Sequence, residues 1–218
     1  MNKNKKNIII SVILLLIAVV YTILVKYVDI QAIGPNESLV GFGTVNAFFK
    51  ELFGVNMTLY KLTNWLGYVA IIMALIYALV GLIQFVKRKN LFKVDKEIFI
   101  LGIFYVIVIG LYLFFEKFII NYRPVLMDGL LEASYPSSHT VLSLCICGSS
   151  LIINNILFKR IKIARIENKV SMVLIFAIVI GRLVSGVHWF TDIVGGVLIS
   201  IALLKIFQTA LQFIKKDN

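Results

Sequence analysis

A histidine and an aspartate in the last part of the chain stand at a spacing that suits nucleophilic chemistry. His188 precedes Asp192 by four residues, so a helix over this segment would place both side chains on one face. A carboxylate in that position can hold one imidazole nitrogen and leave the other nitrogen free to attack phosphorus. The alternative is a structural hydrogen bond at a membrane interface. The spacing therefore predicts a primed nucleophile if groups that bind phosphate lie nearby.

A second histidine follows a short segment that is typical of a helix start. Pro136 ends an irregular stretch, and Ser137 or Ser138 can cap the helix that follows. The free backbone N–H groups and the positive dipole end at such a start suit a phosphate, and His139 would stand beside that anion site. The same four residues are also compatible with ordinary helix capping and no ligand.

Two arginines could supply the positive charge that a phosphate needs. Arg182 interrupts an apolar stretch, where a cation would cost roughly 2.5 to 3.5 kcal/mol at a helix centre, so its presence calls for a functional reason. Arg123 lies in the same predicted loop as His139. Gly181 and Gly186 are the predicted bends that would turn Arg182 toward a shared cavity.

Composition places these residues in a membrane protein. Hydrophobic residues make up 60% of the 218 positions and charged residues only 15%, and the apolar residues gather in stretches long enough to cross a bilayer. Cys145 and Cys147 have no partner cysteines elsewhere and are interpreted as packing residues. We expect an all-α fold in one domain, residues 1–218, with six membrane-spanning helices near 7–26, 62–86, 98–115, 139–158, 170–187 and 192–214.

The basic residues orient these spans. The net charge is +11, but the lysines and arginines gather in short loops and at the termini, which indicates a cytoplasmic location for those segments and argues against nucleic-acid binding. Both termini would then be cytoplasmic, and both histidines, Asp192 and the two arginines would lie on the outer side. The outer segment between the first two spans contains Phe48, Phe49 and Leu52 among charged residues, a pattern that predicts an amphipathic helix in the interface.

Three segments together resemble the motifs of a known family. They are Arg123-Pro124, then Pro136-Ser137-Ser138-His139, then Gly181-Arg182 followed by His188 and Asp192. This set resembles the pattern Lys-x6-Arg-Pro, Pro-Ser-Gly-His and Ser-Arg-x5-His-x3-Asp of the type 2 phosphatidic acid phosphatases, membrane lipid phosphatases of the vanadium-chloroperoxidase-like superfamily.

The chain departs from that pattern at three positions. Glu116 stands where the family has its lysine, and Lys117 comes one residue later. Ser138 replaces the family glycine, and Gly181 replaces the family serine. A glutamate at a phosphate-facing position would repel a dianionic substrate unless Lys117 takes the place of the missing lysine.

The resemblance implies hydrolysis of a lipid phosphate or diphosphate at the outer face of the cell membrane, with no metal and no cofactor. His188 would attack phosphorus to form a phosphohistidine, Asp192 would orient it, and His139 would protonate the leaving oxygen. The phosphate-binding residues would be Arg123, Arg182, Lys117, Ser137 and Ser138. Undecaprenyl diphosphate is one expected substrate, with phosphatidic acid or phosphatidylglycerol phosphate as alternatives. Phosphotransfer to an acceptor other than water, or a membrane binder without enzymatic activity, are further alternatives.

Overall fold

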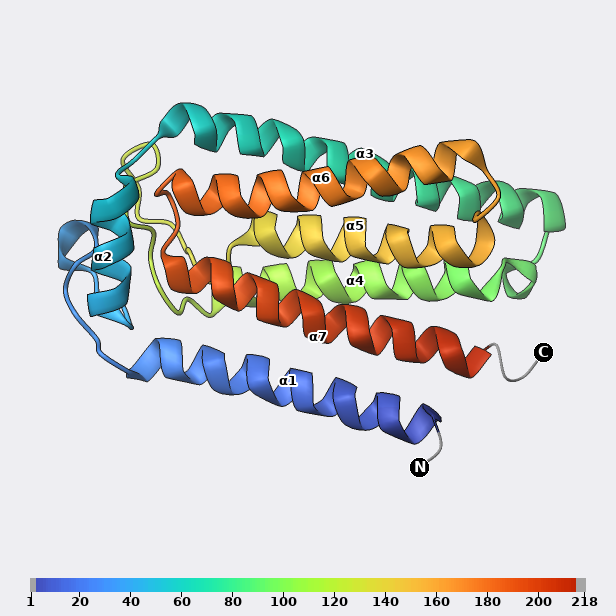
Figure 1. Ribbon diagram of the computed structural model, residues 1–218, viewed down its shortest axis with the longest axis horizontal. Coiled ribbons are helices and arrows are strands. Elements are labelled where there is room, and N and C mark those ends of the chain that lie inside the picture. The colour runs from blue at the N-terminus through green and yellow to red at the C-terminus, as the bar shows by residue number, and fades with distance from the viewer. Residues whose placement is uncertain (1–2, 215–218) are drawn as a thin grey trace.

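The structure is an elongated bundle of α-helices (Figure 1). The computed structural model describes residues 3–214, in which seven α-helices and two short 3-10 turns occur and no named strand is present. The helices are α1 (Lys3–Tyr27), α2 (Gly43–Phe53), α3 (Met57–Arg88), α4 (Lys96–Lys117), α5 (Ser138–Leu157), α6 (Lys162–Val184) and α7 (Phe190–Ile214), and the 3-10 turns are η1 (Pro35–Glu37) and η2 (Leu91–Lys93). The prediction of an all-α fold is confirmed.

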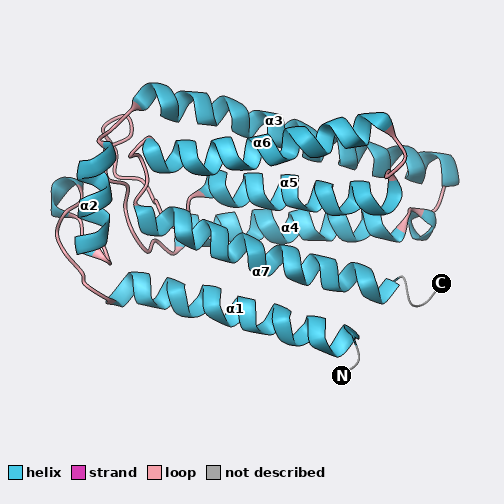
Figure 2. Cartoon of the chain, in the orientation of Figure 1, coloured by secondary structure: helices cyan, strands magenta, loops and turns pink. Residues whose placement is uncertain are grey.

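Six of the helices run side by side, and α2 lies across one end of them (Figures 1 and 2). Helix α5 is central and packs against α3, α4, α6 and α7, whereas α1 packs mainly against α7. Small residues on α5 allow this close packing. At Gly148, for example, an added Cβ would lie 2.6 Å from a methyl carbon of Leu204 on α7. The first turn of α5 lies at the same end of the bundle as α2 (Figure 1).

Five of the helices are long and apolar enough to span a membrane, namely α1, α3, α4, α5 and α7. The sixth predicted span falls on α6, which lies within the bundle beside α3 and α5 but is not one of these five. Its sequence explains the difference, because Glu167 and Lys169 occupy its second turn and Arg182 its last. The structure thus confirms a multi-span helical protein, and the number of crossings depends on how α6 sits in the bilayer.

Helix α2 is docked on the start of α7. The buried Asn46 side chain donates to Thr191 Oγ1 at 2.9 Å and accepts from the Thr191 backbone N–H at 3.2 Å. Phe49 stacks on Phe190 with ring centroids 4.1 Å apart. Phe48 is 60% exposed on the other side of the helix. Helix α2 therefore has one face against the bundle and another that the protein leaves uncovered.

The loop between α4 and α5 folds back on itself as a short hairpin. Tyr122 and Ala133 form an antiparallel bridge, and flanking backbone bonds join Arg123 N to Glu132 O at 3.0 Å and Ser134 N to Asn121 O at 2.9 Å. Side chains eleven residues apart in the sequence are thereby brought next to each other. The hairpin ends against the bundle, where buried Tyr135 packs on α7.

Candidate functional site

His188 lies in the short connection between α6 and α7, and a glycine shapes that connection. Gly186 has a φ of +63°, a conformation that favours glycine, and an added Cβ there would lie 1.7 Å from the backbone oxygen of Gly54. The Asn56 N–H also donates to Ser185 O at 2.9 Å. The loop that carries His188 is therefore pressed against the loop between α2 and α3. Gly186 is a turn, as predicted.

The imidazole of His188 is held from both sides. Arg123 Nη1 lies 3.2 Å from its Nε2, and Ser134 Oγ lies 3.1 Å from its Nδ1. A guanidinium can only donate, so Nε2 must carry the lone pair and Nδ1 the hydrogen. Nδ1–H then donates to Ser134 Oγ, and the Ser134 hydroxyl donates to Asp192 Oδ2. In this chain of bonds Nε2 carries no hydrogen, and its lone pair faces Arg123.

Asp192 is joined to His188 by hydrogen bonds through this serine, and the direct distance between the two side chains is too long for a hydrogen bond. Helix α7 begins at Phe190, after His188, so the pair does not share a helix as predicted, and His188 Nδ1 lies 3.7 Å from Asp192 Oδ2. The carboxylate instead accepts from Ser134 and, at 2.9 Å, from the Trp189 backbone N–H. Sequence reasoning missed Ser134, whose role depends on the hairpin that places it beside Arg123.

The surroundings keep His188 neutral. Its side chain is buried, and burial lowers the pKa of His188 well below its usual range. The positive charges of Arg123 and Arg182, and then His139, lower this pKa further. A neutral imidazole is the form that can attack an electrophile.

His139 stands in the first turn of α5, near α3. An added Cβ at Gly67 would lie 2.8 Å from its Cδ2 atom, so the ring fills the space that this glycine leaves. Its buried Nδ1 has no hydrogen-bond partner among the described residues. Ser137 precedes the helix, is fully buried and receives a hydrogen bond from Thr140 Oγ1 at 3.1 Å, while Ser138 lines the neighbouring pocket.

Arg182 is completely buried in the last turn of α6. Its Nη2 donates to Asn64 Oδ1, and its guanidinium carbon lies 4.6 Å from the centre of the Tyr60 ring. Nε and Nη1 have no hydrogen-bond partner in the part of the chain that the structure describes. The prediction that Gly181 bends the backbone is wrong, because this residue lies within regular α6 and allows close contact with Thr63, 2.5 Å from an added Cβ.

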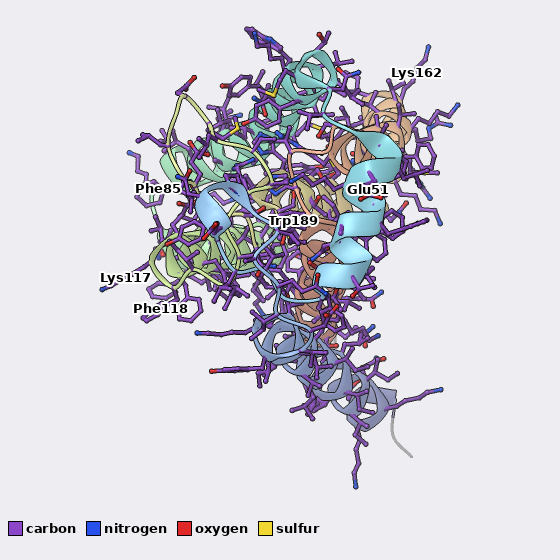
Figure 3. All side chains as sticks on the ribbon, turned by 90° about the vertical axis from the view of Figure 1, so that its left-hand side faces the viewer. Glu51, Phe85, Lys117, Phe118, Lys162 and Trp189 are labelled. Atoms are coloured by element: carbon purple, nitrogen blue, oxygen red, sulfur yellow. The ribbon has the colours of Figure 1, made fainter. Side chains whose placement is uncertain are left out.

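A small pocket of about 30 Å³ opens beside His188, between α4, α5 and the hairpin. Polar groups in its lining include Arg123, Ser134, His188 and Glu116. Lys117 is not brought to this site. It is exposed at the end of α4 and points outward at the edge of the bundle in Figure 3, whereas Trp189, next to His188, lies near the centre of the same view.

The structure therefore brings together most of the residues that the sequence singled out. Arg123, His188 and Asp192 are linked through hydrogen bonds, with His139 and Arg182 close enough to affect the pKa of His188. Tyr60 and Asn64, which contact Arg182, were not predicted. Among residues 3–214, no three or more histidine, cysteine, aspartate or glutamate side chains gather as metal ligands would.

Comparisons with known proteins identify the family and a similar fold. The family described as the PAP2 superfamily matches residues 65–215. The fold is similar to the crystal structure of a transmembrane PAP2-type phosphatidylglycerolphosphate phosphatase from Bacillus subtilis, with a TM-score of 0.57 and 19% identity over 95% of this chain and 97% of that one. At 19% identity, this similarity shows only that the two proteins share a fold. No curated protein matches the chain.

Proposed function

Because the chain belongs to the PAP2 superfamily, we propose that it hydrolyses a lipid phosphate or diphosphate at the outer membrane face through a phosphohistidine on His188. Membership in this family and the several apolar helices identify a lipid phosphatase integral to the membrane. The observation that carries the proposed mechanism is the chain from Arg123 through His188 and Ser134 to Asp192, which leaves Nε2 unprotonated.

Substrate binding begins with the two arginines. Arg123 Nη1, which contacts the His188 lone pair, would turn its hydrogen bond to a phosphoryl oxygen and so free Nε2. Arg182 would add the two donors, Nε and Nη1, that have no partner among the described residues. Ser137 and Ser138, with the first N–H groups of α5, would supply further donors.

The reaction then proceeds in two displacements. Nε2 of His188 forms a bond to phosphorus as the bond to the lipid oxygen breaks, and His139 gives that oxygen a proton. The Nδ1–H of His188 stays on the Ser134–Asp192 relay, which stabilises the positive charge that develops on the ring. In the second step His139 takes a proton from water, the water oxygen attacks phosphorus, and the phosphorus–nitrogen bond breaks to release inorganic phosphate.

We also propose six crossings, with α6 as the sixth and both termini in the cytoplasm. The supporting observation is that the candidate site, α2 and the hairpin share one end of the bundle, whereas the two most basic loops connect helices at the other end. Single cysteines in place of Asp128 and Arg160, labelled from outside intact cells, test this topology. Only the cysteine at position 128 should react.

The substrate is proposed at the level of a membrane lipid phosphate or diphosphate, with undecaprenyl diphosphate, phosphatidic acid and phosphatidylglycerol phosphate as candidates. Hydrolysis and phosphotransfer differ in the fate of the phosphohistidine. Measuring released phosphate with and without an added alcohol acceptor separates the two, because transfer would lower phosphate release and form a new ester.

The central test is release of inorganic phosphate from these lipids in EDTA by the unmodified protein and by His188→Ala. We expect chelator-resistant activity that the substitution removes, by about a thousandfold or more. An acid-labile phosphoryl group should be trapped on the unmodified protein alone. Glu51→Gln, a change at an exposed residue of α2, is the control. An obligatory divalent cation, or full activity in His188→Ala, would contradict the mechanism.

A further inference from the structure

The candidate site contains one buried cation and one exposed anion that the protein leaves unpaired. Within residues 3–214, Arg182 has no carboxylate and Glu116 has no basic side chain at ion-pair distance. Arg123 and Glu132 are paired with each other, because Arg123 Nε lies 3.1 Å from Glu132 Oε2. The buried Asp192 carboxylate accepts hydrogen bonds from Ser134 and from the Trp189 N–H. Arg182 and Glu116 are therefore the two charges considered as partners for a substrate, and they lie on different helices.

The unpaired positive charge points to a phosphate. Arg182 is 0% exposed, and its Nε and Nη1 have no partner in the described chain, so the protein alone satisfies only part of this buried guanidinium. The Tyr60 ring lies 4.6 Å from the guanidinium carbon of Arg182 and 6.0 Å from that of Arg123, which places the two arginines around one aromatic side chain. Arg123 reaches His188 from there.

The unpaired negative charge lies in the pocket beside His188, which Arg123 lines as well. Glu116 on α4 lines the pocket together with Arg123, Ser134 and His188. Tyr112, one turn earlier on α4, lines the same pocket. Lys117, the nearest basic residue in the sequence, points away from the site (Figure 3). An anion at the position where the family pattern has a lysine would repel a second negative charge on the substrate.

We propose that this site selects lipid phosphates that carry a protonated amine a few bonds from the phosphate, as in a long-chain 2-amino-alkyl phosphate. The phosphate binds Arg123 and Arg182 next to His188, and the ammonium binds the carboxylate of Glu116. This inference rests on the proposed function and deepens it. A zwitterionic head group satisfies both unpaired charges, which neither phosphatidic acid nor a diphosphate does.

The experiment compares two lipids that differ at the amine, which is charged in one and acetylated, and therefore neutral, in the other. Phosphate release is measured for sphinganine 1-phosphate and for N-acetylsphinganine 1-phosphate, with the full chain in the same detergent micelles. We expect kcat/KM to be about three- to fivefold higher for the free amine, the range of a partly exposed ion pair. The preference should disappear as the pH rises above the pKa of the amine, and the ratio of the two rates cancels the titration of protein groups common to both reactions.

Variants at Glu116 give the second readout. In Glu116→Gln the ratio should fall to about one through slower hydrolysis of the amine lipid, and in Glu116→Lys it should fall below one. The control Glu51→Gln removes a carboxylate from the exposed face of α2 and should keep the ratio of the unmodified protein (Figure 3).

The outcomes separate this inference from the function on which it rests. Equal rates on both lipids, or a preference that survives in Glu116→Gln, would overturn the amine selection and leave the phosphatase in place. A folded protein that releases no phosphate from either lipid or from phosphatidic acid would overturn both.

Discussion

Two buried polar clusters lie at opposite ends of the bundle, and they differ in how completely their hydrogen bonds are satisfied. At the end away from α2, Tyr77, Asn154 and Glu167 join three helices. The Tyr77 hydroxyl donates to Asn154 Oδ1 at 2.8 Å, and Asn154 Nδ2 donates to Glu167 at 2.7 Å and to Asn168 at 2.9 Å. None of these side chains has a buried polar atom without a partner in the described chain.

The cluster around His188 is different. Buried atoms of Arg182, His139 and Asp192 have no hydrogen-bond partner among residues 3–214. Leaving such groups unpaired lowers the stability of the folded state, whereas a closed network raises it. We infer that the first cluster stabilises the fold, and under the proposed function a bound substrate would complete the hydrogen bonds of the second. Substitutions in the two clusters should therefore separate stability from activity.

After His188→Ala, the largest loss of activity is expected for Arg182→Ala. Loss of a buried guanidinium that stabilises the transition state should lower kcat/KM by about 10²- to 10³-fold. The melting temperature in detergent should stay the same or rise, because the substitution removes a buried charge that has no counter-ion in the described chain. A large drop in melting temperature would show that Arg182 stabilises the folded protein, and it would contradict the proposed difference between the two clusters.

The next effect is that of Ser134→Ala, which interrupts the relay between His188 and Asp192. A hydrogen bond to a charged group contributes about 1.5 to 3 kcal/mol, so kcat should fall by roughly 10- to 100-fold with a smaller change in KM. Ser143→Ala, which removes a buried serine that bonds only to a backbone carbonyl, is the matched control. Unchanged kcat and an unchanged pH profile in Ser134→Ala would show that the serine has no part in orienting the imidazole.

The opposite pattern is expected for Asn154→Leu. This substitution leaves the Tyr77 hydroxyl and the Glu167 carboxylate with fewer partners, and the free energy of unfolding should fall by about 1 to 2 kcal/mol. Unfolding in a denaturing detergent series measures it. Since Asn154 lies far from His188 along the bundle, kcat per folded molecule should not change, and a change would indicate that the two ends are coupled.

The smallest effect is a shift in pH dependence. The nucleophile must be neutral, and burial with neighbouring positive charges lowers the pKa of His188. A lowered pKa keeps the ring neutral to lower pH, so the acid limb of the kcat/KM profile should lie below the pH at which an exposed histidine titrates. Arg182→Lys keeps a positive charge and should leave that limb in place, whereas a limb at the ordinary histidine pH would show that the site is more hydrated than its burial indicates.

Part of this site could be read from the sequence, because local spacing fixes local geometry. The separation of His188 and Asp192, and an arginine in an apolar stretch, pointed to side chains that the structure brings close together. Their contacts could not be read in the same way. Ser134 reaches His188 only because the hairpin pairs Tyr122 with Ala133, and Tyr60 and Asn64 reach Arg182 only because α3 packs against α6.

The position of Lys117 has an equally simple physical reason. Helix α4 stays regular up to this residue, and successive side chains on a helix are about 100° apart around its axis. Glu116 faces the pocket, so Lys117 must face elsewhere. A shift of one position in a motif is therefore a change of face, which the one-dimensional pattern does not reveal.

The docking of α2 on α7 indicates how much of the chain this enzyme needs for activity. The region that matches the family begins at residue 65, yet Asn46 caps the first turn of α7 and Gly54 meets Gly186 beside the nucleophile. A shortened chain that started at residue 65 would keep every residue of the family motifs. It would lose the contacts of Asn46 and Gly54 with the segment on either side of His188. The family motifs contain the candidate site residues, and the segment before residue 65 supplies contacts beside His188 that those motifs do not include.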